Sequence, residues 1–292
     1  MHRPGLAAES RAQARLREII ASCHSHCAPR QADYAGMKLL ILGESDSHGF
    51  GLEDSSQAWG NLLPAELARQ SGLEIETTHL AYYAHTATSL SYLERVLAKG
   101  PFDIVVFSVT SIGFTLLSVD HRIGRLFGPR IGEFFKSGVD RFDTTTHRKG
   151  DEGWVKKANR AAHALARNTI GQEPMASYEF VLENHQKIVA RLARLEDTEV
   201  VILGPTDHGG RLAQRVRKTQ PQVETFRAIV RAEAERRRLT WIDRQKLSEM
   251  FADRDAEFVD GLHKGPRFHG RIVSAVLGVL AQSSPVLTSS AR

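Results

Sequence analysis

Short apolar runs alternate with longer amphipathic stretches along most of this chain. The apolar runs occupy residues 38–42, 103–109, 199–203 and 239–242, and a run of mixed polarity occupies residues 73–81; each has the length of a strand. Apolar positions recur at helical spacing in residues 59–70, 90–97, 178–192, 226–237 and 268–280. Because nearly continuous apolar strands need cover on both faces, this order predicts an α/β fold in which a five-stranded parallel sheet lies between two helical layers.

The alternation is absent at both ends of the chain and in one internal stretch. Residues 1–36 form a polar, Arg-rich extension with a weak helical pattern at 10–22, and residues 283–292 form a tail. Residues 118–175 break into clusters of Gly, Arg, Asp and Thr, with one helical pattern at 154–167. We therefore expect one domain over residues 37–282, interrupted by an insertion at about 118–175.

The composition is typical of a globular protein and argues against a membrane span and a nucleic-acid partner. The chain has 292 residues, of which 41% are hydrophobic and 25% charged, as in ordinary globular proteins. No apolar run approaches the roughly 18 residues that cross a bilayer, and the first residues lack the apolar core of a secretory signal. The net charge of +5 is spread along the chain rather than gathered in one basic tract. We expect a cytoplasmic protein with no membrane span and no nucleic-acid partner, and its oligomeric state stays open.

The two cysteines lie close together in the segment Cys23-His24-Ser25-His26-Cys27. This segment offers four soft ligands, but ligands so crowded cannot surround one zinc ion tetrahedrally without strain. Two cysteines also cannot provide a disulfide framework for a chain of this size. We expect neither a metal nor an organic cofactor.

Candidate chemistry begins directly after the first apolar run, in the sequence Gly43-Glu44-Ser45-Asp46-Ser47-His48-Gly49-Phe50-Gly51. A serine placed here can be exposed on a tight turn between a strand and a helix, as a nucleophile requires. Ser45 equally fits a turn or cap hydrogen bond that carries no chemistry. Glycine-rich loops also bind phosphate, but the spacing matches neither a Walker loop nor Gly-x-Gly-x-x-Gly.

A second candidate segment, Val259-Asp260-Gly261-Leu262-His263, lies just before the last helical pattern. An Asp three residues before a His can hold one imidazole nitrogen, which leaves the other free to accept a proton from a hydroxyl. The same spacing also arises from chance or from local capping. Reactive groups of parallel sheets gather at the carboxyl ends of the strands, so Ser45 is the hydroxyl that we expect there.

Together these segments resemble the SGNH hydrolases, also called the GDSL esterases and lipases. Residues 40–51 resemble the nucleophile block of that family, with Glu44 in place of its usual Asp. Residues 260–263 resemble its closing block, Asp-x-x-His. The resemblance extends over about residues 37–282.

The resemblance implies a flavodoxin-like three-layer α/β/α fold and a hydrolase that acts on ester bonds. It implies Ser45 as nucleophile, His263 as general base and Asp260 as the residue that orients the base. The substrate it implies is a small-molecule or carbohydrate acyl ester, for example an O-acetylated sugar or a short acyl ester. No cofactor takes part in this chemistry.

Two inner blocks of the family are matched less closely. Residues 79–86 align with the segment whose Gly amide helps to bind the oxyanion, and Ala84 takes the place of that Gly. A backbone N–H survives this change, so the resemblance implies the N–H groups of Ser45 and Ala84 as oxyanion donors. In the block Gly-x-Asn-Asp the Asn position carries Ile112, and we include Ser111 beside it in the expected oxyanion site.

Five polar residues near these blocks are candidates for the wall of the pocket: Glu44, His48, His85, Thr110 and His208. Any one of Thr110, Ser111 and His85 carries a donor that can replace the missing Asn. Each of these residues equally fits an ordinary loop hydrogen bond.

Alternatives to the esterase stay open. Loss of one oxyanion donor typically lowers the rate by about 10² to 10³, so Ile112 favours a catalytically impaired binding or scaffolding protein as the alternative. An acyltransferase would use the same three residues with an acceptor other than water. A flavodoxin-like nucleotide binder ranks below both, because no phosphate-binding motif is present.

Overall fold

The computed structural model describes residues 36–118, 122–123, 125–126, 128 and 172–282. The chain divides into two compact units, one made of Met1–Thr110 with Leu182–Arg292 and the other of Ser111–Val181. Several predicted features fall outside the described residues: the helices at 10–22 and 154–167, Cys23, Cys27 and the tail at 283–292. The limits of the domain and of its insertion therefore stay predictions.

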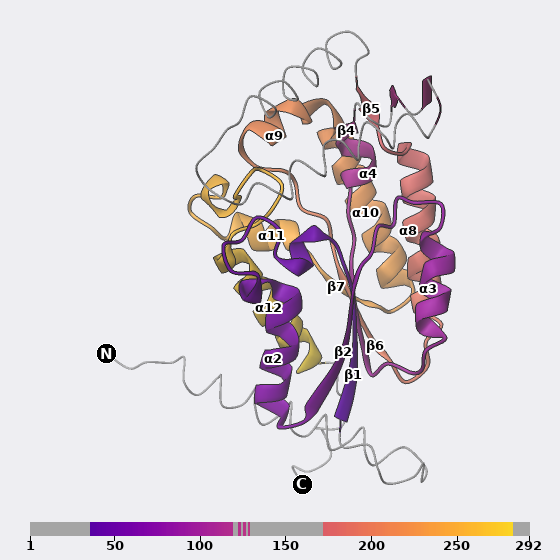
Figure 1. Cartoon of the computed structure of the whole chain (residues 1–292), viewed down its shortest axis with the longest axis vertical. Helices are drawn as coiled ribbons and strands as arrows, with labels where there is room; N and C mark the ends of the chain where they lie inside the picture. The colour runs from indigo at the N-terminus through magenta and orange to yellow at the C-terminus, as the bar shows by residue number, and fades with distance from the viewer. Residues whose placement is uncertain (1–35, 119–121, 124, 127, 129–171, 283–292) are drawn as a thin grey trace. The chain divides into compact units, whose positions relative to one another are not determined.

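The first unit contains a parallel sheet of five strands, β1 (Gly36–Gly43), β2 (Glu74–Ala81), β3 (Ile104–Ser108), β6 (Glu199–Leu203) and β7 (Thr240–Ile242). Their order across the sheet is β2-β1-β3-β6-β7, and each neighbouring pair is parallel. The order is that of flavodoxin-like sheets, in which ligands bind where the strand order reverses, at the carboxyl ends of β1 and β3. The predicted five-stranded parallel sheet is thus confirmed (Figure 1).

Helices cover both faces of this sheet (Figure 1). One face carries α2 (Trp59–Ser71), α11 (Arg244–Glu249) and α12 (Pro266–Leu280). The other carries α3 (Ser89–Leu97), α10 (Gln220–Arg236) and, from Leu182 onward, α8 (Tyr178–Leu192). The predicted α/β/α layers are confirmed. Within the described ranges, no helix combines the length and the apolar character that crossing a bilayer needs.

The core between the sheet and helices α2 and α12 contains alternate residues of the strands. Leu39 and Ile41 of β1 point to this side and pack in one cluster with Trp59 and Leu63 of α2 and Phe268 of α12. Successive side chains of a strand point to opposite faces, so the residues between them line the other core. Full burial of a large apolar side chain stabilises the fold by about 1.5–3 kcal/mol, and none of these five is exposed.

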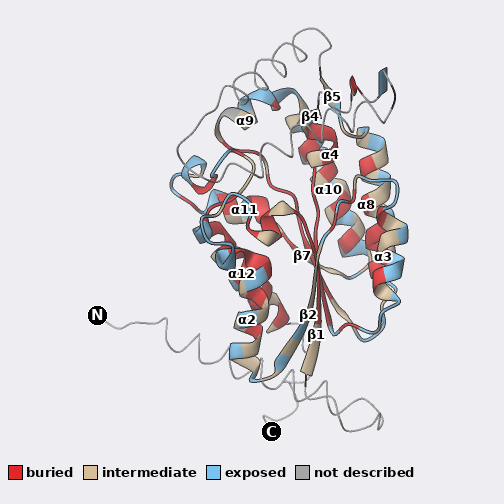
Figure 2. Cartoon of the chain, viewed as in Figure 1, coloured by how far each residue is buried: buried red, intermediate tan, exposed pale blue. Residues whose placement is uncertain are grey.

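The opposite core combines aromatic rings with one buried histidine. Phe107 of β3 lies 5.9 Å from Tyr82 and 5.9 Å from His185 of α8, measured between ring centroids. His185 packs against Phe226 of α10 at 5.1 Å, and its Nε2 accepts a hydrogen bond from the N–H of Thr110 at 3.4 Å. This core therefore reaches the carboxyl end of β3. Figure 2 shows that buried residues follow the strands and the inner sides of the helices.

The start of one long helix and several short elements differ most from the sequence prediction. The helix α10 begins at Gln220, well before residue 226, because Pro221 fits the first turn of a helix. The hydrophobic pattern does not predict α4 (Ile112–Thr115), α9 (Gly210–Arg215), α11, or the 3-10 turns η1 (Ser45–His48), η2 (Ser55–Gln57), η3 (Arg217–Thr219) and η4 (Asp255–Glu257). Segments this short contain too few apolar positions to show helical spacing.

The described part of the second unit contains α4 and two short strands. β4 (Leu117–Ser118) pairs antiparallel with β5 (Glu173–Pro174). Phe114 packs edge-on against Tyr178, with ring centroids 5.2 Å apart. These contacts bring the two ends of the predicted insertion together.

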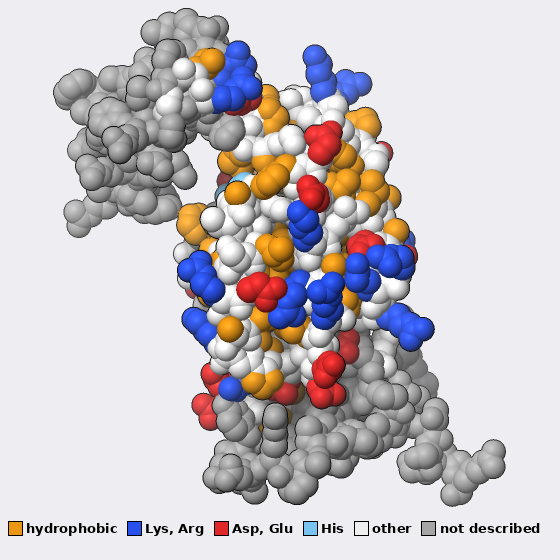
Figure 3. All heavy atoms as spheres, turned by 90° about the vertical axis from the view of Figure 1, so that its right-hand side faces the viewer, with side chains coloured by type: hydrophobic (Ala, Val, Ile, Leu, Met, Phe, Trp, Pro, Cys, Tyr) orange, Lys and Arg blue, Asp and Glu red, His pale blue; other side chains and the backbone are white. Residues whose placement is uncertain are grey.

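Charged side chains of both signs cover the face that carries α3 and α8 (Figure 3). Ion pairs join several of them, including Arg191 with Glu94 at 2.7 Å and Lys187 with Glu183 at 2.6 Å. Exposed pairs contribute only about 0–1 kcal/mol each to stability, so their main effect is to balance the basic charge locally.

Candidate active site

The loop after β1 is a tight turn that presents Ser45. Gly43 ends the strand where no side chain fits, since a Cβ would lie 2.1 Å from Oγ of Ser47. The Ser47 hydroxyl donates to the carbonyl oxygen of Glu44 at 2.7 Å, and the chain then turns through η1. Gly49 closes the turn with a φ of 82°, a left-handed conformation that favours glycine. Ser45 therefore stands directly beyond a buried strand, at the carboxyl edge of the sheet.

The loop before α12 is shaped around Asp260. Oδ1 of Asp260 accepts hydrogen bonds from the backbone N–H groups of Leu262 at 2.9 Å and His263 at 2.8 Å. Gly261 has a φ of 87°, and a Cβ there would approach the carbonyl oxygen of Gly209 to 2.7 Å. The turn therefore holds the carboxylate beside the imidazole of His263.

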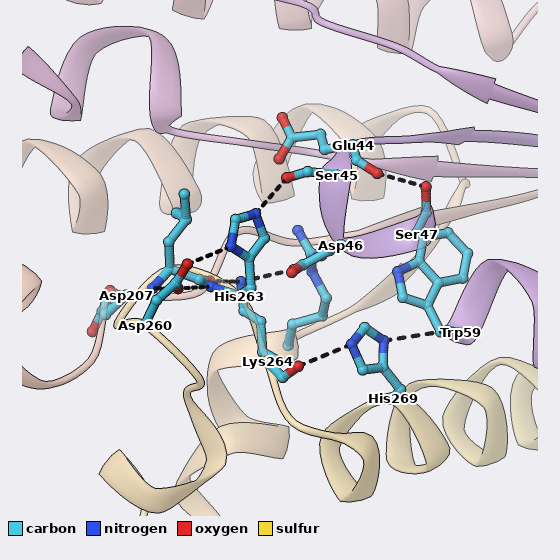
Figure 4. Close-up of polar contacts among 12 residues, drawn as sticks. Glu44, Ser45, Asp46, Ser47, Trp59, Asp207, Asp260, His263, Lys264 and His269 are labelled. Carbon is cyan, nitrogen blue, oxygen red and sulfur yellow. Dashed lines mark hydrogen bonds and ion pairs between the residues drawn. The ribbon is translucent and has the colours of Figure 1, made fainter. Parts of the chain in front are cut away.

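Asp260, His263 and Ser45 form one hydrogen-bonded chain (Figure 4). Nδ1 of His263 lies 2.7 Å from Oδ2 of Asp260, and Nε2 lies 3.0 Å from Oγ of Ser45. With the Nδ1 proton directed at the carboxylate, Nε2 is free to accept the serine proton. This arrangement can generate an alkoxide-like nucleophile during attack on a carbonyl carbon.

Asp260 can orient the imidazole because its carboxyl group is ionised at neutral pH. Burial acts to raise its pKa, but hydrogen bonds from the backbone and ring of His263 and from the Leu262 N–H lower the pKa below its ordinary value. The Asp260 side chain is 51% exposed, so water screens part of its charge. The hydrogen bond between Asp260 and Nδ1 holds the ring in one orientation.

The loop after β1 also contacts His263 directly. Gly51 has a φ of 85°, and a Cβ there would lie 2.9 Å from Cβ of His263. Glycine therefore lets the loop approach the histidine closely. The ring of Phe50 lies 6.2 Å from that of His263 and is largely exposed, which gives the site an apolar border.

The predicted oxyanion residue Ala84 follows β2, which runs beside β1. The two strands are paired to their ends, where Gly43 lies opposite Ala81. Beyond that point the N–H of Tyr82 donates to the carbonyl oxygen of Gly43 at 2.6 Å. The segment that contains Ala84 is thus attached to the start of the loop that carries Ser45.

Asn184 of α8 holds this segment and was not found by sequence reasoning. Its side-chain amide donates to the carbonyl oxygens of Ala84 at 3.1 Å and Thr86 at 3.2 Å. In the part of the chain that the structure describes, the N–H groups of Ser45 and Ala84 donate to no other residue. Neither N–H therefore has a partner within the described ranges, and Ala84 itself is fully buried.

Ser111 and Ile112 belong to the second unit. The carbonyl oxygen of Ser111 accepts hydrogen bonds from the N–H of Thr115 at 3.1 Å and from its hydroxyl at 3.0 Å. Ile112 is the first residue of α4. The role of Ser111 as an oxyanion donor stays a prediction.

Glu44 is buried next to Ser45 and has an altered acidity. Burial raises its pKa to about 7, although a hydrogen bond with Thr110 and the charges of Arg244 and Lys264 oppose the rise. The nearby Asp46 adds to the rise. Oε1 of Glu44 has no hydrogen-bond partner among the described residues. Near neutral pH the carboxyl group therefore exchanges between its neutral and charged forms.

Glu44→Gln is expected to gain stability relative to the native protein as the pH rises. A carboxyl whose pKa is raised on folding stabilises the folded state below its ordinary pKa of 4.5 and loses that contribution as the pH rises to about 7. The native protein should lose up to about 3 kcal/mol over this range, whereas the glutamine variant should not. Urea unfolding of both proteins at pH 4.5 and at about pH 8 measures the difference.

The control for this prediction is Glu53→Gln, which removes an exposed carboxyl group from the same loop. Its stability relative to the native protein should change little between the two pH values. A Glu44→Gln variant whose relative stability is the same at both pH values would contradict the assignment of a raised pKa to Glu44.

Arg244 is a second residue that sequence reasoning missed. It is buried, and its guanidinium group donates to the carbonyl oxygens of Gly204 at 2.6 Å and Val109 at 2.8 Å. It therefore joins the carboxyl ends of β6 and β3, and its charge lies close enough to lower the pKa of Glu44. The one sequence signal is its position two residues after the last strand.

Asp46 and Lys264 form a buried ion pair beside Ser45 and His263 (Figure 4). Nζ of Lys264 lies 2.8 Å from Oδ2 of Asp46. Burial acts to raise the pKa of Asp46, but the charge of Lys264 and the hydrogen bond from its ammonium group outweigh burial and lower the pKa to about 2. Asp46 is therefore charged at neutral pH.

His48, a predicted pocket residue, stacks on His79 of β2. Their ring centroids are 3.8 Å apart and their planes differ by 3°. Nε2 of His79 lies 2.8 Å from the hydroxyl of Ser47. Burial lowers the pKa of both histidines, that of His79 to about 4, so the stacked pair is uncharged at neutral pH. The pair supports the turn that carries Ser45.

His85, Thr110 and His208 are the other predicted pocket residues. His85 is partly buried beside Tyr83, with ring centroids 5.8 Å apart, and burial lowers its pKa. Thr110 is buried beyond the end of β3. His208 is buried after β6, where burial and the charge of Lys264 lower its pKa to about 4. A role for each in substrate binding stays a prediction.

No group of three or more His, Cys, Asp or Glu side chains within the described ranges is arranged to hold a metal ion. The segment at 23–27 lies outside those ranges, so the absence of a metal site stays a prediction. Transfer of a proton between serine and histidine itself needs no metal.

Comparison with known proteins identifies the fold. No family model and no curated protein sequence matches this chain. The lipase/acylhydrolase from Enterococcus faecalis is 13% identical to it with a TM-score of 0.53, over 84% of this chain and 96% of that one. A catalytic mutant of Axe2, an acetylxylan esterase from Geobacillus stearothermophilus, is 13% identical with a TM-score of 0.51, over 86% of this chain and 96% of that one. At these identities the likeness establishes the fold, which is that of the SGNH hydrolases.

Proposed function

We propose that this protein is a serine esterase that hydrolyses O-acyl esters. In this proposal Ser45 is the nucleophile, His263 is the general base and Asp260 orients the base. The observation that carries the proposal is the continuous hydrogen-bonded chain through these three side chains at the carboxyl edge of the sheet. The fold shared with a lipase/acylhydrolase and an acetylxylan esterase supports the same class of reaction.

The first half of the reaction acylates the serine. Nε2 of His263 accepts the hydroxyl proton while Oγ of Ser45 bonds to the carbonyl carbon of the ester. The N–H groups of Ser45 and Ala84 donate hydrogen bonds to the oxyanion that forms. The bond to the leaving oxygen then breaks, and His263 returns the proton to the departing alcohol.

The second half of the reaction releases the acid. His263 takes a proton from water, and the oxygen of that water bonds to the acyl carbon. The bond to Oγ of Ser45 then breaks, and His263 returns the proton to the serine. One ester and one water have become one alcohol and one acid, while Asp260 keeps the imidazole in the same orientation throughout.

The substrate that we propose is a small-molecule or carbohydrate acyl ester. Exposed apolar side chains stand beside the residues of the site, namely Phe50, Tyr83 and Val259. Surfaces of this kind contact an acyl chain or the face of a sugar ring. With an alcohol in place of water, the same acyl-enzyme would give acyl transfer.

The second candidate is a binding or scaffolding protein with this fold and little activity. It is favoured by Ile112, which stands where the resembling family carries an oxyanion-binding Asn. A side chain without a donor cannot replace that interaction. In such a protein Ser45 would not react as an activated nucleophile.

Labelling with a fluorophosphonate, followed by peptide mass spectrometry, separates the two candidates. An esterase should carry the adduct on Ser45, because only an activated serine attacks the phosphorus rapidly. The Ser45→Ala variant should carry no adduct, whereas Ser56→Ala, which changes an exposed serine of the same loop, should label like the native protein. Folded native protein that remains unlabelled at Ser45 would reject the esterase and leave the binding protein.

A further inference from the structure

We propose that the Asp46–Lys264 ion pair sets the distance and angle between the two reacting side chains, Ser45 and His263. The proposal rests on the esterase function above, since positioning matters only if these side chains react. In it, Asp46 and Lys264 are positioning residues that act through their chain neighbours. Sequence reasoning gave neither of them a role.

Each member of the ion pair adjoins one of the reacting residues. Asp46 directly follows Ser45, and Lys264 directly follows His263. Neighbouring Cα atoms are about 3.8 Å apart, so a displacement of either charged residue displaces the reacting residue as well. Two interactions thus run side by side between the same two loops, the ion pair at 2.8 Å and the serine–histidine contact at 3.0 Å.

Burial makes the ion pair hard to open. The side chains of Lys264 and Asp46 are only 8% and 10% exposed. Separation would leave two charges in a region with little water, which is strongly unfavourable. Nζ of Lys264 also donates to the carbonyl oxygen of Leu262 at 3.0 Å, so the ammonium group is held by its own loop as well.

The lysine is anchored to the helices behind the site. The carbonyl oxygen of Lys264 lies 3.2 Å from Nε2 of His269, the buried histidine of α12. Nδ1 of His269 accepts a hydrogen bond from the N–H of Trp59 at 3.2 Å, at the start of α2. The ion pair therefore connects the nucleophile loop to a segment that is itself fixed to both helices on this face.

Neither charged group touches the reacting atoms. Among the described residues, the polar partners of the Lys264 ammonium are Asp46 and the Leu262 carbonyl, not Ser45 or His263. Loss of the pair should therefore change the alignment of the serine and the imidazole rather than their chemistry. A misplacement of about 1 Å in such a site can lower the rate by about 10²-fold.

The test is the double variant Asp46→Leu/Lys264→Met. It removes both charges together, and apolar replacement of a buried ion pair often preserves stability. We expect a thermal unfolding midpoint near that of the native protein, but a kcat for a short-chain aryl ester lower by about 10- to 100-fold. KM should stay within about twofold, and the rate of fluorophosphonate labelling at Ser45 should fall in parallel with kcat. An ion pair that only stabilised the fold would leave both rates unchanged in a folded variant.

Three further variants keep the test decisive. Lys264→Arg keeps the charge and should keep most of the native kcat. Asp46→Asn/Lys264→Gln removes both charges but keeps a hydrogen bond between the two side chains. It takes the place of the Leu/Met variant if that protein does not fold, and it should also show a reduced kcat. Glu94→Gln/Arg191→Gln removes an ion pair between α3 and α8, two segments that are also distant in sequence, and should leave kcat unchanged.

The outcomes separate this proposal from the esterase function. A folded double variant with kcat within about twofold of the native value overturns the positioning role while the esterase stands. A native protein that neither hydrolyses the ester nor labels at Ser45 overturns the esterase and the positioning role with it. The proposal is supported if the double variant loses kcat while Lys264→Arg keeps most of the native kcat.

Discussion

Replacing Ser45 by alanine is expected to lower kcat for a short-chain aryl ester by about 10⁴-fold or more. Without Oγ no acyl-enzyme forms, and only the remaining oxyanion donors and bound water contribute to the rate. The fold should be unaffected, because Ser45 is only partly buried and its hydroxyl hydrogen-bonds to His263 across a loop surface. Initial rates measured beside thermal unfolding of both proteins provide the comparison.

The control for this loss is Ser56→Ala, which should retain the native kcat. It removes a hydroxyl from an exposed position of the same loop and touches none of the three residues of the hydrogen-bonded chain. If the native protein and Ser45→Ala hydrolyse the ester at the same rate, the measured activity does not arise from this site.

Asp260→Asn is expected to lower kcat by about 10²- to 10⁴-fold, and to be more harmful than Asp260→Ala. Oδ1 of Asp260 accepts two backbone hydrogen bonds, from Leu262 and His263. The amide oxygen of an Asn must take this position, because an amide NH₂ cannot accept hydrogen bonds. The NH₂ group then faces Nδ1 of His263, so the ring proton moves to Nε2, which can no longer accept a proton from Ser45.

The comparison of asparagine with alanine tests this account of Asp260. Alanine removes the orienting carboxylate but places no donor against Nδ1, so some of the rings keep the productive tautomer. With the same ester, kcat should be highest for the native protein, lower for Asp260→Ala and lowest for Asp260→Asn. An asparagine variant at least as active as the alanine variant would mean that the carboxylate does not set the tautomer of His263.

The strands of the sheet are the most predictable part of the fold. A strand buried on both faces appears in the sequence as a continuous apolar run, so residues 38–42 mark the middle of β1 and residues 199–203 mark all of β6. The start of α10 is not marked in this way. Of its first six residues only Val223 is buried, so helical spacing becomes visible only at Phe226.

Part of the candidate site is equally local in the sequence. Ser45 lies in a short glycine-rich segment, and Asp260 and His263 lie in another. Parallel strands direct both segments to the same edge of the sheet, so their approach follows from the fold class. The resemblance to a known family could then assign them roles before any distance was known.

The supporting residues are not local and could not be predicted. Asn184 holds Ala84 from 100 positions away, and Arg244 reaches Val109 from 135 positions away. In the sequence Asn184 reads as an ordinary polar position on a predicted helix, and Arg244 lies in a segment for which no helix is predicted. Their contribution arises only from contacts that the complete tertiary structure creates.

The distance along the chain between Ser45 and His263, 218 positions, also bears on how activity would appear during folding. The ribosome makes the serine early and the histidine late, and α12 must dock on α2 before the imidazole reaches the hydroxyl. Contacts between such remote segments form late, because their loop entropy is large. Recovery of ester hydrolysis after dilution from denaturant would therefore report the final docking step, whereas far-ultraviolet circular dichroism would follow the earlier growth of helices and strands.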